Sequence, residues 1–120
     1  MYKILVFVVF VSCLSKSQAC PSEYFDGGSG NYCFHVGFTP MSQYEAYIYC
    51  GSMNLGELVD PKYISNSLKF KLKFIAELHP VRKWWLADCK ELELELDAGK
   101  FKTNDLNCYE KRMPICEIWR

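Results

Sequence analysis

The chain has few of the residue clusters that catalysis or metal binding requires. It contains no Cys-x-x-Cys pair, and its two histidines, His35 and His79, stand alone. Zinc sites are built from clustered Cys and His ligands, so zinc is the less favoured interpretation of the cysteines. The sequence also lacks a Gly-x-Ser-x-Gly elbow, and no Lys-Ser or Lys-Thr follows the glycine-rich residues 26–31, which therefore predict a turn. These absences argue against an enzyme.

Long apolar runs are missing after the first residues. Lys3 precedes an apolar run at residues 4–11, and a small-x-small cleavage pattern ends at Ala19. This predicts a secretory signal peptide over residues 1–19, too short in its apolar part to cross a bilayer; an uncleaved anchor is the alternative. We expect one secreted, extracellular domain over residues 20–120, with no membrane span.

An excess of positive charge is absent as well. Residues 20–120 hold 12 basic and 14 acidic residues, because two lysines lie in the predicted signal peptide. The resulting net charge near −2 disfavours a nucleic-acid partner and gives no special attraction to anionic membranes.

Cysteine, in contrast, is plentiful. Six of the seven cysteines lie in residues 20–120. An even number in a short secreted chain predicts three disulfides, and spacing alone leaves all 15 pairings open.

The first predicted helix follows Thr39 and Pro40. Threonine is a good N-cap, and proline fits the first helical position. Tyr44, Tyr47 and Ile48 then recur at helical spacing. This stripe predicts the buried face of the helix.

The remaining elements predict an α+β fold. A second helix is expected from residue 65 or 66 to residue 78, with Leu68, Leu72 and Ile75 facing inward and Phe74 as a further candidate for that face. Short strands are expected at residues 24–25, 32–36, 57–59, 84–87, 90–96 and 100–102. An N-terminal hairpin, two helices and a small antiparallel sheet built late in the chain follow from this order. The last segment, with Cys108 and Cys116, is expected at the centre of the fold.

Two adjacent tryptophans lie in one predicted strand. Because neighbouring strand residues face opposite sides, we expect at least one of Trp84 and Trp85 to be buried and the other to be exposed.

The alternation of Leu and Glu over residues 90–96 predicts Leu toward the core and Glu toward water. Glu91, Glu93 and Glu95 would be spaced nearly 7 Å apart, about two residues' rise, which is too far for them to share one cation. Lys100 and Lys102 are their expected cross-strand partners.

The order of these elements, together with six short motifs, resembles a C-type lectin-like domain over nearly all of residues 20–120. The motifs are Cys20-Pro21 with Asn31-Tyr32-Cys33, Tyr44-Glu45-Ala46 before Cys50, Gly56-Glu57-Leu58-Val59, Trp84-Trp85-Leu86-Ala87, Gly99-Lys100-Phe101 with Asn104-Asp105, and Cys108 with Ile115-Cys116-Glu117. The resemblance implies three disulfide pairs, Cys20–Cys33, Cys50–Cys116 and Cys89–Cys108.

The resemblance also bears on calcium. In sugar-binding members of the family a long loop carries Glu-Pro-Asn or Gln-Pro-Asp, which bind calcium and sugar hydroxyls together. Here only three residues separate Trp85 from Cys89, so that loop is absent. Asp88, Asn104 and Asp105 match positions that can ligate calcium in the family. Calcium takes six to eight oxygen ligands, so we expect no complete calcium site, no cofactor, and a structural turn role for Asn104 and Asp105.

We therefore expect a secreted, non-catalytic recognition module of the C-type lectin-like family. Its expected partner is an extracellular protein or glycan, bound without a complete calcium site. A carbohydrate-binding lectin, calcium-dependent or not, is one alternative, and a toxin-like or structural small disulfide protein is a second. The sequence leaves the ligand-binding residues and the oligomeric state undefined.

Overall fold

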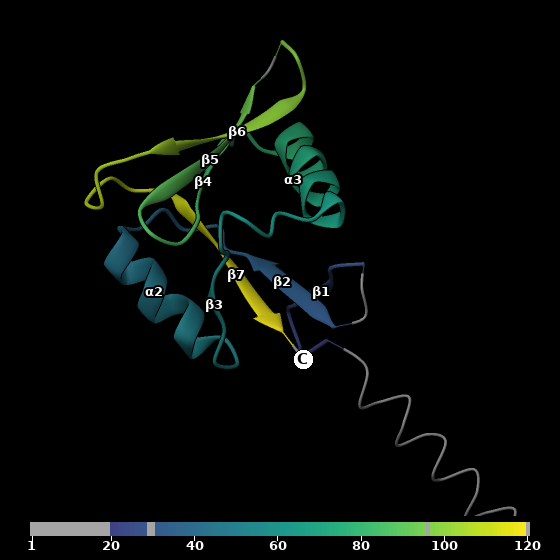
Figure 1. Cartoon of the computed structure of the whole chain (residues 1–120), viewed down its shortest axis with the longest axis vertical. Helices are drawn as coiled ribbons and strands as arrows, with labels where there is room; N and C mark the ends of the chain where they lie inside the picture. The colour runs from purple at the N-terminus through teal and green to yellow at the C-terminus, as the bar shows by residue number, and fades with distance from the viewer. Residues whose placement is uncertain (1–19, 29–30, 96, 120) are drawn as a thin grey trace, which may run out of the picture.

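The computed structural model describes residues 20–28, 31–95 and 97–119, so the predicted signal peptide and Leu96 lie outside the described residues. Two helices and seven strands make up this part of the chain (Figure 1). In chain order they are β1 (Phe25–Asp26), β2 (Tyr32–Val36), α2 (Gln43–Ser52), β3 (Glu57–Leu58), α3 (Asn66–Leu78), β4 (Lys83–Trp85), β5 (Lys90–Glu95), β6 (Lys100–Asp105) and β7 (Met113–Trp119).

The strands form one mixed sheet. Its order is β1-β2-β7-β4-β5-β6, and β3 pairs separately with β7. The prediction of an antiparallel sheet is wrong at one place, since β4 runs parallel to β7. The chain leaves β4 into the β5–β6 hairpin and returns to lie beside β4 in the same direction. The last strand, β7, therefore lies between β2 and β4, at the centre of the fold as predicted.

Three disulfides join these elements. Cys20–Cys33 closes the N-terminal hairpin, Cys50–Cys116 ties α2 to β7, and Cys89–Cys108 links the residues before β5 to those after β6. These are the same pairs that the resemblance implies.

The two helices pack on opposite faces of the sheet (Figure 1). One core contains Trp84 with Leu68 and Leu72 of α3, and the other contains Trp85 with Ala46 and Cys50 of α2.

Both tryptophans are fully buried. The expectation of one exposed ring is therefore wrong. Adjacent rings do face opposite sides of β4, but each side is covered by a helix.

Helix α2 begins three residues later than predicted. Its N-cap is Ser42, whose hydroxyl accepts from the Glu45 backbone N–H while the Glu45 carboxylate accepts from the Ser42 N–H. This capping box satisfies two backbone N–H donors at the start of the helix. A helix that started at Thr39 and Pro40 would have no capping box. Helix α3 has the predicted bounds, with Ser65 as N-cap. The candidate inward position of Phe74 is wrong, because that side chain is 50% exposed and Ala76 is buried in addition to the three predicted residues.

The predicted buried face of α2 is also wrong. Tyr44, Tyr47 and Ile48 are exposed, and the buried residues of the helix are Ala46 and Cys50. The disulfide to β7 requires Cys50 to face the sheet. At 3.6 residues per turn that orientation brings Ala46 inward and turns Tyr44 and Ile48 more than a quarter-turn away.

Candidate functional site

The three predicted vestigial calcium positions lie near the β5–β6 hairpin. Asn104 and Asp105 are the last two residues of β6, so the prediction that they form a turn is wrong. Adjacent strand residues point to opposite faces, and these two have different partners. The Asp105 carboxylate forms an ion pair with Lys90, its cross-strand neighbour. The exposed Asp88 lies outside the strands, with a backbone φ of 59°.

The Asn104 amide binds carboxylates of β5. Its Nδ2 donates to Glu91 Oε2 at 3.0 Å and to Glu93 Oε1 at 2.9 Å. Lys102 Nζ lies 3.6 Å from Glu93 and 3.9 Å from Glu95. The chain's own donors and cations therefore neutralise the row of three carboxylates.

The prediction that all three glutamates face water is wrong for Glu91. Its side chain is 4% exposed, and Oε1 accepts from Arg112 Nε at 2.7 Å. Burial alone would raise the pKa of Glu91. The hydrogen bonds and positive charge of Arg112, together with the Asn104 amide, outweigh burial and hold the pKa of Glu91 below its ordinary value.

These residues do not fit a calcium ion. Asn104 and Asp105 are directed to different partners on opposite faces of β6, and the Asp105 charge is balanced by Lys90. Within the described ranges, no three His, Cys, Asp or Glu side chains are grouped so that they could hold a metal ion.

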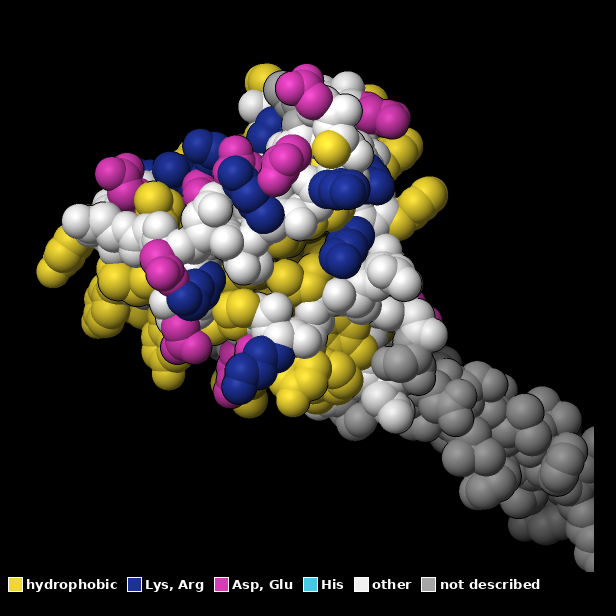
Figure 2. Space-filling model, turned by 45° about the horizontal axis from the view of Figure 1, so that its top comes forward, with side chains coloured by type: hydrophobic (Ala, Val, Ile, Leu, Met, Phe, Trp, Pro, Cys, Tyr) yellow, Lys and Arg dark blue, Asp and Glu magenta, His cyan; other side chains and the backbone are white. Residues whose placement is uncertain are grey.

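A second surface is the outer side of α2. Tyr44 is 74% exposed, Tyr47 67% and Ile48 52%. We call these three residues the α2 face. Figure 2 shows hydrophobic side chains projecting from two opposite sides of the domain, the sides on which Figure 1 places α2 and α3. Apolar side chains that gather on an exposed helix face indicate an interaction surface.

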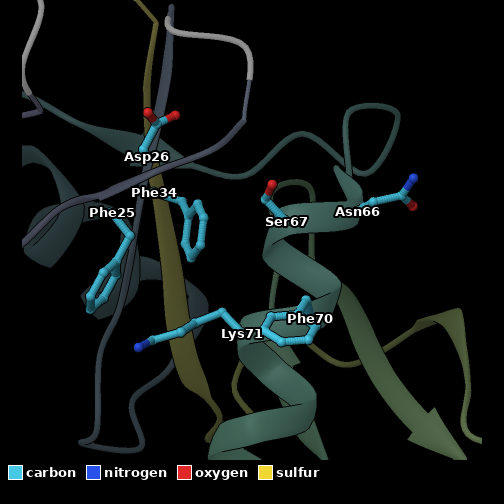
Figure 3. Close-up of a pocket in the computed structure, with 7 residues that line it drawn as sticks. All are labelled: Phe25, Asp26, Phe34, Asn66, Ser67, Phe70 and Lys71. Carbon is cyan, nitrogen blue, oxygen red and sulfur yellow. The ribbon is translucent and has the colours of Figure 1, made fainter.

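A third surface is a groove between α3 and the N-terminal hairpin. It encloses about 580 Å³ and is shown in Figure 3. Phe25 and Phe70 form its walls, the buried Phe34 lies at its base, and the Lys71 side chain extends across it toward Phe25. Asp26 and Ser67 supply polar groups at the end of the groove near the start of α3, whereas the Asn66 side chain points away from it.

Sequence reasoning missed Lys90 and Arg112 as internal partners of the carboxylates. A signal was present for Lys90, because the β5–β6 register sets it opposite Asp105. The sequence contained no such signal for Arg112, because its partner Glu91 lies 21 residues earlier in the chain.

The comparisons with known proteins bear on the fold. No protein-family model matches the chain, and no curated protein matches it. Solved structures do match. Human lithostathine is 18% identical with a TM-score of 0.62, covering 85% of this chain and 92% of lithostathine. The mouse CD72a C-type lectin-like domain is 23% identical with a TM-score of 0.63, covering 85% and 95%. Rhodocetin is 17% identical with a TM-score of 0.65, covering 85% and 98%.

The architecture is thus that of a disulfide-linked α+β domain with one helix on each face of a mixed sheet. More particularly, it is the C-type lectin-like fold, which confirms the fold predicted from the sequence motifs. No helix in the described part of the chain is long and apolar enough to span a membrane.

Proposed function

We propose that this chain is a secreted, non-catalytic recognition module that binds an extracellular protein through the α2 face, without calcium. The α2 face carries the proposal, because Tyr44, Tyr47 and Ile48 lie on one side of a rigid helix and are more than half exposed. Helix α2 is anchored to the central strand by Cys50–Cys116. A rigid helix that presents tyrosines loses little conformational entropy when it binds.

Calcium independence is supported by the partners of the calcium positions. Lys90 pairs with Asp105, and the Asn104 amide binds Glu91 and Glu93. A sugar ligand that needs calcium would have to displace these contacts.

A glycan is the second candidate ligand. Among solved structures with this fold, one is a murine dendritic cell inhibitory receptor 2 domain in complex with N-glycan, and another is a complex with GlcNAc. A third is described as an antagonist of a collagen-receptor integrin. Other proteins with this fold therefore include some with glycan ligands and one with a protein target. The exposed tyrosine rings of the α2 face favour a protein here, because tyrosine is enriched in protein interfaces.

Binding to arrays of extracellular proteins and of glycans tests this function. Each array is probed with the wild-type domain in calcium and in chelator, and with the triple variant Tyr44→Ser/Tyr47→Ser/Ile48→Ser. Tyr63→Ser, a change at another exposed tyrosine, is the control. We expect protein ligands that are retained in chelator and with Tyr63→Ser, and lost with the triple variant. Ligands that are exclusively glycans and require calcium would contradict the proposal.

A further inference from the structure

Charge is distributed unevenly along the domain although its sum is close to zero. Residues 20–61 contain five acidic residues and no Lys or Arg. Residues 62–83, which include α3, contain six basic residues and one acidic residue. The domain therefore contains a strongly basic segment although its net charge is only −2. The exposed phenylalanines of α3 lie in this segment.

The outer side of α3 carries a line of apolar side chains beside the exposed Lys73 and Glu77. Phe70, Phe74 and Leu78 are spaced four residues apart, so they form a line along one side of the helix. They are 76%, 50% and 65% exposed, and Phe25 of β1, which lines the groove with Phe70, is 43% exposed. We call these four residues, with Lys71 and Lys73, the α3 face.

Lys71 lies among the aromatic rings of the α3 face, whereas Lys73 Nζ is 6.0 Å from the centre of the Phe101 ring of β6. Lys71 Nζ is 4.2 Å from the centre of the Phe25 ring and 5.7 Å from that of Phe74. Within the described part of the chain, the ion pairs involve other residues, and neither Lys71 nor Lys73 has a carboxylate within 4 Å. Both ammonium groups are thus available to an external anion.

The geometry points to a membrane as the occupant: we propose that the α3 face docks on the surface of a bilayer that contains anionic phospholipid. With about 200 Å² for a fully exposed aromatic side chain, the exposed fractions of the three phenylalanines correspond to about 340 Å² of apolar surface, and Leu78 adds to it. Phenylalanine and leucine side chains can enter the boundary between headgroups and acyl chains, while flanking lysines bind the anionic headgroups.

The charges favour this occupant over a second copy of the chain. Residues 62–83 hold six basic residues and one acidic residue, so two α3 faces packed on each other would bring two basic segments together. An anionic bilayer neutralises that charge instead. Because α2 packs on the opposite face of the sheet, a docked domain keeps the α2 face free (Figure 1).

Co-sedimentation with vesicles tests the proposal, using residues 20–120 with their disulfides formed. One set of vesicles is phosphatidylcholine alone and the other is phosphatidylcholine with phosphatidylserine. The variants are Phe70→Ser/Phe74→Ser and Lys71→Gln/Lys73→Gln, and the matched control is Tyr47→Ser/Ile48→Ser on α2. All of these side chains except Lys71 are exposed, so the variants should fold; circular dichroism checks this.

We expect binding to the phosphatidylserine vesicles that weakens as NaCl is raised. The phenylalanine variant should weaken it more than about tenfold, and each lysine should contribute about fivefold. The α2 control should bind like the wild type. Absence of binding, equal binding by the control and the phenylalanine variant, or a dimer in sedimentation that dissociates with Phe74→Ser would overturn the proposal.

Discussion

Removal of Arg112 should destabilise the domain far more than removal of Glu91, although the two form one ion pair. With Arg112→Met, the Glu91 carboxylate stays 4% exposed and keeps only the Asn104 amide as a donor. Breaking a buried pair in this way costs about 3–5 kcal/mol. We expect about 3 kcal/mol, at the lower end of that range, because Asn104 remains and the Arg112 side chain is 22% exposed.

The reverse change leaves a milder defect. With Glu91→Met, the Arg112 guanidinium can still donate to the Lys111 carbonyl and reach water, so we expect a loss of about 1 kcal/mol. The double variant should lie within about 1 kcal/mol of the wild type, since no unpaired buried charge remains.

Urea unfolding at pH 7, followed by the fluorescence of the buried Trp84 and Trp85, measures these values. Lys102→Met is the control, because its pair with Glu93 is half exposed and should contribute less than about 1 kcal/mol. The pKa of Glu91 is lowered, so its contribution is present above pH 4.5 and is lost as the pH falls through the folded-state value. Arg112→Met should reduce this acid sensitivity. A loss of stability below about 1 kcal/mol for Arg112→Met would refute the reasoning. So would a double variant whose loss equals the sum of the two single losses.

Three further predictions concern stability. Trp84→Ala and Trp85→Ala should each cost about 3–5 kcal/mol in urea unfolding, because both rings are fully buried; a small loss for either would mean that one face of β4 is not packed. Ser42→Ala should cost about 1 kcal/mol by removing the cap of α2, and no change in melting temperature would show that the capping box does not form. Burial raises the pKa of Glu117, so stability should fall as the pH rises above 4.5 and the folded-state carboxyl ionises. Glu117→Gln should remove that fall, and parallel melting curves against pH for the two proteins would contradict it.

The sequence predicted the parts of the fold that local signals determine. Helix α3 has an N-cap serine, an inward stripe of leucines and a proline just after its end. The central place of β7 followed from two cysteines that must reach back to earlier elements.

The predictions that were wrong concern features that depend on tertiary packing. The stripe of Tyr44, Tyr47 and Ile48 has the spacing of a buried face, yet the disulfide at Cys50 sets which side of α2 meets the sheet. The Cys50–Cys116 pair implied by the resemblance carries this constraint, but the spacing of the helical stripe alone does not show it. The burial of Glu91 likewise depends on Arg112, which approaches from the segment before β7.

The candidate site was predicted less well than the fold. The absence of the long loop indicated that calcium was disfavoured. Lys102 was predicted as a partner of the glutamates and does pair with Glu93 and Glu95, but Lys90 and Arg112 were not foreseen. The α2 and α3 faces could not be identified either, because an amphipathic pattern does not reveal which exposed apolar residues remain after the core is filled.

The melting temperature in the presence and absence of calcium tests the central claim most directly. A ligand that binds only the folded state raises the melting temperature according to its concentration relative to its dissociation constant. With calcium at about 1 mM, near the weak end of extracellular sites, we predict the same melting temperature as in chelator. A clear rise that disappears with Asp105→Ala would contradict the account and restore calcium-dependent sugar binding as the function.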